Sequence, residues 1–223
     1  MSAPRHEAFT LLELLVVVGL VAFLAGVFGL TFHNGNPASA LQSAQGTVAS
    51  LLAAARGEAA LRQTRAMLVV DADAAGVHFL RGIHLAVESS PNSGQWQITG
   101  VGAVLPPGIC VVPGTGALDG VTFAAAGSAS GIWPVRRRSS LELAPAGRLA
   151  AGSENPAGKY LTMTAPLTAL GNAGTGGGDK LVLAAARRTS TGVTFDQPEL
   201  VRGVALSSYG MAILINDGPD FDF

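Results

Sequence analysis

The chain has 223 residues and a formal net charge of -1, so its length suits one domain with an additional segment and its overall charge does not favour a polyanion. Charged residues make up 13% of the sequence, about half of the ~25% typical of soluble domains. The mean hydropathy is correspondingly high, at +0.40. The single cysteine, Cys110, excludes an intramolecular disulfide and a cysteine-rich metal site.

The N-terminal segment consists of a short polar leader, residues 1–8, and a long apolar run, residues 9–32. As a helix this run would span ~36 Å, which exceeds the ~30 Å hydrocarbon core of a bilayer. The leader carries a positive charge at Arg5, and few charges follow the run, so the N-terminus is predicted to be cytoplasmic. An ordinary secretory signal is disfavoured because no clear small-residue cleavage site follows. We therefore predict a transmembrane helix.

Glu13 lies near the start of the apolar run, where a simple membrane anchor gains nothing from a carboxylate. An isolated charge is costly in lipid, so such a residue is a functional candidate. The cost falls if the carboxylate meets a positive group, such as the free N-terminal amine of a neighbouring subunit. Glu13 therefore favours an assembly of many such helices packed side by side.

Residues 8–17 read AFTLLELLVV and closely resemble the class III signal of type IV pilins and type II secretion pseudopilins. The resemblance implies that a prepilin peptidase cuts between Ala8 and Phe9 and N-methylates Phe9. It also implies that Glu13 guides subunit docking. The family nearly always has glycine before the cut, whereas this chain has Ala8.

A second helix is predicted after the breaker cluster Asn34–Pro37. Apolar residues recur at helical spacing, and Ser39 is a plausible N-cap. The helix should extend roughly from residue 38 to 63, within an amphipathic extension of the first helix assigned to residues 33–65. Its apolar side is predicted to pack on a sheet, and the residues on that side are Leu41, Val48, Leu52, Ala55 and Ala59.

The stretch from Leu51 to Gly76 resembles the GspH/FimT group of minor pseudopilins, in which an Ala-Arg-x-Glu-Ala pattern ends the helix before a basic turn and the first strand. Arg56 and Glu58 belong to this pattern. They are not neighbours on a helix face, so they need not pair with each other. They are predicted either to contact the sheet or an adjacent subunit, or to be plain surface charges.

The remaining chain, residues 66–223, is predicted to form a β-rich body outside the cytoplasm. Residues 113–178 are rich in Gly, Ala, Ser and Pro and are interpreted as an elaborated loop region with two short strands. The predicted strands are 66–70, 77–87, 95–104, 109–112, 121–125, 159–163, 180–186, 192–195, 201–207 and 211–215.

No catalytic constellation, cofactor motif or metal site is predicted, so the protein is not expected to be an enzyme. His78 and His84 lack a second pair of ligands at zinc spacing. Arg136–Arg138 form the strongest positive cluster and are the candidate nucleic-acid contact, with Arg187–Arg188 as a second cluster. The acidic tail counts against DNA binding, although its aromatic residues, Phe221 and Phe223, are candidates for docking on a partner.

Together these observations predict an α+β fold, with one long N-terminal helix, its first half transmembrane, packed on an antiparallel sheet. The predicted function is that of a structural minor pilin or pseudopilin in a type IV pilus or type II secretion pseudopilus. Its partners would be a prepilin peptidase, other pilin subunits, an inner-membrane assembly platform and membrane lipid. The protein would be a single-pass bacterial inner-membrane protein before assembly. The alternatives are a DNA-binding minor pilin for DNA uptake and a signal-anchored extracytoplasmic protein that does not polymerise.

Overall fold

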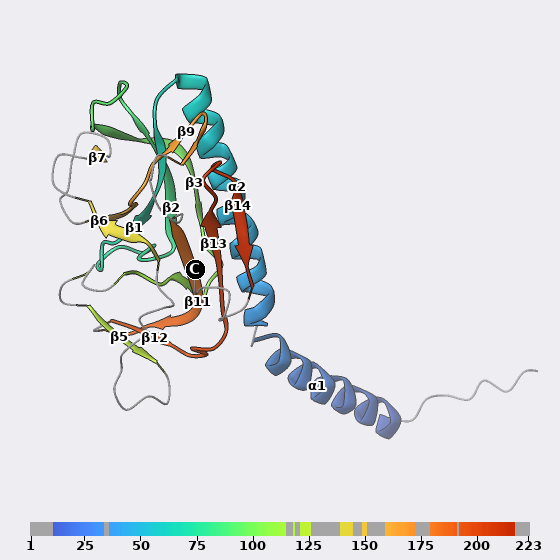
Figure 1. Cartoon of the computed structure of the whole chain (residues 1–223). Coiled ribbons are helices and arrows are strands. Elements are labelled where there is room, and N and C mark those ends of the chain that lie inside the picture. Colours follow the sequence, from blue (N-terminus) through green and yellow to red (C-terminus); the bar gives the residue numbers. More distant parts are fainter. Residues whose placement is uncertain are drawn as a thin grey trace, which may run out of the picture. The chain divides into compact units, whose positions relative to one another are not determined.

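The computed structural model of the chain (Figure 1) falls into two compact units, residues 1–36 and residues 37–223, which are described separately. The residues that the structure describes are 11–33, 36–114, 118, 121–125, 139–144, 149–150, 159–172, 179–190 and 192–216.

The first unit contains helix α1, which extends from Leu11 to His33. Its composition is dominated by Leu and Val, with Glu13 as the acidic residue of the first turn. A carboxylate at this position interacts favourably with the positive end of the helix dipole. The side chains are described from Leu11 to Leu24, and all of them are exposed.

The predicted transmembrane segment and the predicted inner-membrane location are wrong. Within the described residues, no helix combines the length and the apolar character needed to cross a membrane.

The second unit begins with helix α2, from Pro37 to Arg62, within one residue of the predicted helix at each end. Proline is favoured in the first turn because the N–H that it lacks has no partner within the helix there. The helix ends where Gln63 adopts a left-handed conformation, with φ of 53°. The amide of Thr64 then donates to the carbonyl of Ala59 at 3.2 Å, which satisfies one of the terminal carbonyls.

The first sheet has eight strands among the described residues, and its central part is the antiparallel meander β1–β2–β3. The main strand order is β10-β9-β1-β2-β3-β7, while β8 pairs with β1 and with β6. The strands are β1 (Ala66–Asp71), β2 (Gly82–Glu88), β3 (Trp96–Val104), β6 (Leu141–Leu143), β7 (Leu149–Ala150), β8 (Tyr160–Met163), β9 (Leu167–Thr168) and β10 (Gly171–Asn172).

The second sheet has six strands among the described residues, in the order β14-β13-β11-β12-β5, with β4 paired to β11. Two of the described strand pairs are parallel, β3 with β7 and β5 with β12, and the others are antiparallel. The strands are β4 (Ile109–Val111), β5 (Thr122–Ala125), β11 (Lys180–Arg188), β12 (Gly192–Phe195), β13 (Val201–Leu206) and β14 (Ala212–Ile215).

Helix α2 lies along the strands of both sheets (Figure 1) and joins them into one hydrophobic core. Alanines on its inner face, such as Ala44 and Ala55, are completely buried and let the backbone approach the strands closely. Gln45 is also buried, and its Nε2 donates to the carbonyls of Gly203 at 2.7 Å and Ile215 at 2.9 Å. These bonds satisfy a polar side chain that would otherwise be costly to bury.

The predicted fold, one long N-terminal helix on an antiparallel sheet, is wrong in two respects. The helical sequence forms two helices, because α1 ends at His33 and α2 starts at Pro37, which cannot donate to a preceding turn. The body forms two sheets, because β4 leaves the first meander and pairs with β11 instead of β3. Residues 113–178 also contain β6, β7, β9 and β10, which the sequence analysis missed because each is only two or three residues long.

Candidate functional site

The first candidate surface is the exposed apolar surface of α1. Residues 14–18 read Leu-Leu-Val-Val-Val and, at ~100° per residue, they surround the helix axis. Leu11 is 83% exposed and Phe23 is 71% exposed, so neither end of the described run is covered. A helix that is apolar on all sides is normally buried in a core or an assembly.

Glu13, the predicted assembly residue, lies on this surface between the exposed Leu12 and Leu14. The structure therefore brings a carboxylate and an apolar surface together in the first turns of α1. The predicted processing residues, Ala8 and Phe9, lie outside the described residues.

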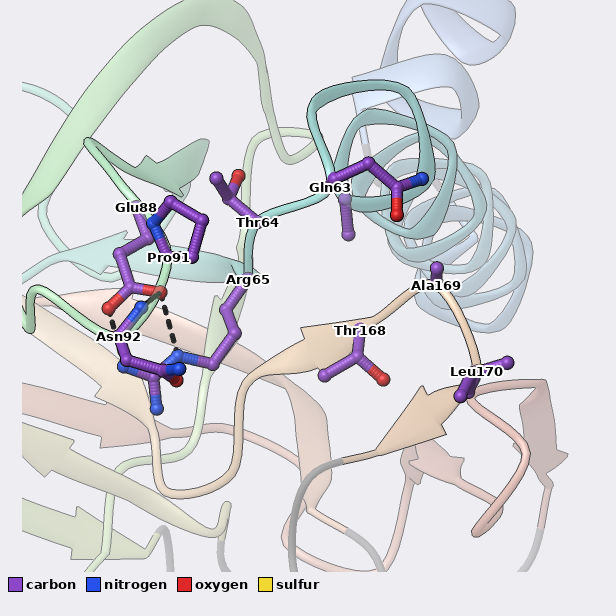
Figure 2. A pocket seen from close by; sticks show the side chains of 10 residues that line it. Gln63, Thr64, Arg65, Glu88, Pro91, Asn92, Thr168, Ala169 and Leu170 are labelled. Atoms are coloured by element: carbon purple, nitrogen blue, oxygen red, sulfur yellow. Dashed lines mark hydrogen bonds and ion pairs between the residues drawn. The ribbon is translucent and has the colours of Figure 1, made fainter.

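A second candidate site is a cavity of about 340 Å³ at the C-terminal end of α2. Figure 2 shows its three walls: the end of the helix with Gln63, Thr64 and Arg65, the segment after β2, and the β9–β10 turn with Leu170. Leu170 is 90% exposed at the rim. The complete lining is Ala59, Gln63, Thr64, Arg65, Glu88, Pro91, Asn92, Thr168, Ala169 and Leu170.

An ion pair between Arg65, which follows α2, and Glu88, at the end of β2, lies in the wall of this cavity (Figure 2). Arg65 Nε donates to Glu88 Oε2 at 2.8 Å, and Nη2 donates to Oε1. The carboxylate also accepts the amides of Gly94 at 2.7 Å and Asn92 at 3.2 Å. The guanidinium carbon lies 5.7 Å from the ring centroid of Trp96, within the range of a cation–π contact.

The electrostatics of the pair point to a structural role. The hydrogen bond from Arg65 lowers the pKa of Glu88 below its ordinary value, against the opposing effect of burial. The same bond raises the pKa of Arg65. Both groups therefore stay charged and neutralise each other. The sequence analysis placed Arg65 in a basic turn but did not single out Glu88, whose pairing depends on the register of β1 and β2.

Arg56 and Glu58 are not paired with each other in the structure, as the helix spacing indicated. Arg56 Nη1 lies 3.1 Å from Met211 Sδ, so Arg56 contacts the segment just before β14. Glu58 accepts Arg62 Nε at 2.7 Å, an i,i+4 pair on the surface of α2. Pairs of this kind contribute only about 0.3–0.5 kcal/mol.

His84 lies in β2, whereas His78 lies in the segment before that strand and not on the predicted shared strand. The His84 ring makes an edge contact with Tyr160, with 6.4 Å between centroids. Gly102 leaves room for it, because a Cβ there would lie only 2.9 Å from His84 Nδ1. Burial lowers the pKa of His84, and the nearby Asp71 opposes this effect. Among the described residues, no group of three or more His, Cys, Asp or Glu side chains is arranged to hold a metal ion.

One of the two basic clusters lies within the described residues. Arg136, Arg137 and Arg138 lie outside the described residues. Arg188 donates to the carbonyls of Gly76 and Ala74, and Arg187 Nη2 lies 3.4 Å from Asp196 Oδ1. The second cluster is therefore used within the body.

Cys110 is buried in β4. Burial raises the pKa of its thiol to about 11, so the group stays protonated at neutral pH and is a poor nucleophile.

Comparison with known proteins gives no relative for this chain: no family model, no curated protein and no solved structure matches it.

Proposed function

We propose that this protein is a structural subunit of a filament of the type IV pilus or type II secretion pseudopilus kind, present as a minor component. The observation that carries the proposal is the exposed apolar surface of α1, which surrounds the helix over residues 14–18. Copies of α1 packed side by side would remove this surface from water. Full burial of one Val, Leu or Phe side chain contributes about 1.5–3 kcal/mol.

Glu13 gives the assembly its register. In an apolar bundle of helices, a carboxylate is tolerated where it meets a positive group, and burial of an unmatched charge is penalised. The free amine of a processed N-terminus on a neighbouring copy supplies that group. The proposal therefore includes cleavage between Ala8 and Phe9 by a prepilin peptidase and N-methylation of Phe9, as the resemblance of residues 8–17 implies.

The first test addresses processing. The full chain is produced with and without a prepilin peptidase, and the mature N-terminus is read by mass spectrometry. The expected product begins with N-methylated Phe9 and lacks residues 1–8. A chain that keeps Met1 in the presence of an active peptidase contradicts the proposal.

The second test addresses assembly by the processed chain. Glu13→Ala should abolish co-sedimentation with filaments while leaving cleavage unchanged, because cleavage acts before docking. Glu58→Ala is the matched control, since Glu58 lies on the surface of α2 and should leave assembly intact. If the two variants assemble equally well, Glu13 has no assembly role.

A further inference from the structure

The cavity at the C-terminal end of α2 has the size and the mixed lining of a ligand site. Its volume of about 340 Å³ lies at the lower end of the range of roughly 300–1,000 Å³ that is typical of small-ligand pockets. Three segments that are far apart in the sequence form its wall (Figure 2): the end of α2, the segment after β2, and the β9–β10 turn. The wall therefore belongs to the folded body and does not involve α1.

Only the cation of the Arg65–Glu88 pair is accessible to a ligand. The side chain of Glu88 is 0% exposed, and its oxygens already accept hydrogen bonds from Arg65 and from the amides of Asn92 and Gly94. The side chain of Arg65 is 31% exposed, and among the described residues its Nη1 makes no hydrogen bond. Glu88 and the Trp96 ring fix the position of the guanidinium. The cavity therefore presents a fixed donor whose charge is neutralised by a carboxylate that a ligand cannot reach.

The end of the helix adds little acceptor capacity to this wall. The carbonyl of Ala59 accepts the amide of Thr64 at 3.2 Å, and the carbonyl of Ala60 accepts Gln63 Nε2 at 2.6 Å. Terminal carbonyls of a helix commonly lack such partners and attract cations. Since these two are occupied, the cavity suits a ligand that brings an oxygen acceptor better than one that brings an ammonium group.

The apolar part of the lining lies beside these donors. Leu170 is 90% exposed at the rim, and Ala169 and Pro91 also line the cavity. An aliphatic group placed against them would be partly removed from water. The amide side chains of Gln63 and Asn92, which also line the cavity, are able to pair with the N–H and the carbonyl of a peptide unit.

We infer that this cavity binds an uncharged peptide segment of a partner protein, with a backbone carbonyl on the Arg65 guanidinium and an aliphatic side chain against Leu170. A peptide unit combines the oxygen acceptor with the apolar group that the wall requires. An uncharged segment fits because the ion pair is already neutral, so an anion would gain little from Arg65 while approaching Glu88. This binding site is additional to the proposed filament function and does not depend on it.

An NMR titration of the isotope-labelled full chain tests the site. The probe is N-acetyl-L-leucine N-methylamide, which is uncharged and carries peptide carbonyls and an aliphatic side chain. Saturable shifts are expected in residues 63–65, 91–92 and 168–170, with a dissociation constant of about 1 mM, as is usual for a ligand of this size. N-acetylglycine N-methylamide should bind at least about tenfold more weakly, because it lacks the aliphatic side chain.

Two pairs of variants locate the contacts. Leu170→Ala should weaken binding of the leucine probe at least about threefold. Leu61→Ala is its matched control, because Leu61 is also highly exposed but does not line the cavity, and it should leave binding unchanged. Arg65→Lys keeps a cation beside Glu88 but removes the planar guanidinium, so it should also weaken binding. Arg62→Lys, outside the cavity lining, should not.

Three results would overturn the inference. The first is the absence of saturable shifts up to about 20 mM probe, well above the expected dissociation constant. The second is equal binding by Leu170→Ala and Leu61→Ala. The third is at least about tenfold tighter binding of N-acetyl-L-leucine, whose free carboxylate would identify an anion site instead. None of these measurements involves cleavage at Phe9 or Glu13, so failure here is distinct from failure of the proposed filament function.

Discussion

The two helices of this chain differ in the exposure of their apolar residues. Helix α2 contains many small residues, yet its apolar side is almost completely buried against two sheets, with Leu41 and Val48 at 0% exposure. Helix α1 is far more apolar, yet all of its described side chains are exposed. The hydrophobic character of a helix therefore indicates that it packs against another apolar surface. Whether that surface belongs to the same chain depends on the rest of the fold. For α2 the partner is the body, and for α1 we propose copies of the same helix.

The strongest test of this difference in burial is to place a charge in each helix. Leu52→Asp in α2 should lower the free energy of unfolding of residues 37–223 by roughly 4–5 kcal/mol, because an unpaired carboxylate would be buried in the core. Leu15→Asp in α1 should change it by less than about 0.5 kcal/mol, since Leu15 is exposed. Urea denaturation followed by tryptophan fluorescence measures both values. Equal losses in the two variants would contradict the contrast between the helices.

The sequence predicted α2 well because its signals are local. The breaker cluster before Pro37, the apolar residues at helical spacing and the basic turn after Arg62 all lie within the helix or next to it. Most of the longer strands also lie close to the predicted ranges, because apolar runs between turn signals mark them. The exception is the predicted strand 77–87, because β2 begins only at Gly82.

The two-sheet arrangement was not predictable in the same way. It depends on β4 pairing with β11, about seventy residues later in the chain, and on two parallel pairs. Composition and periodicity carry no information about such distant partners. Among the very short strands, β7 pairs with β3, β9 pairs with β1, and β10 pairs with β9, so no local pattern marks them.

The second prediction concerns the ion pair between Arg65 and Glu88 near the end of α2. Arg65→Met should lower the free energy of unfolding by about 3 kcal/mol, because it leaves the buried Glu88 carboxylate without its cation. Arg62→Met is the matched control in the same helix end, and it should cost less than about 0.5 kcal/mol because its pair with Glu58 is exposed.

The pH dependence of this effect has a definite sign. The pKa of Glu88 is lowered in the folded chain, so the stability from the pair is present above the ordinary pKa of 4.5 and is lost as the pH falls through the folded value. The difference between wild type and Arg65→Met should therefore shrink in acid. Urea denaturation at pH 7 and below pH 4 measures it, and a difference that stays constant would rule out the ion pair as its source.

The candidate sites were predictable only in part. Glu13 stands out in the sequence because a carboxylate interrupts an apolar run. Arg65 and Glu88 do not stand out, because neither belongs to a motif and their contact depends on the register of β1 and β2. His84 was visible as a histidine, but the predicted strand 77–87 also contained His78, which the structure places before β2.

The smallest expected effect concerns His84, whose environment lies between those of the two helices because its ring is only partly buried. Burial lowers its pKa, so the unfolded chain binds a proton more readily than the folded chain. Stability should therefore fall as the pH decreases from about 6.5 through the lower folded value. His84→Gln should flatten this slope between pH 7 and 5. Urea denaturation of the wild type and of the variant across that range measures the difference. A wild-type slope that persists in His84→Gln would mean that other groups govern the acid response, and that partial burial of the ring has no energetic consequence.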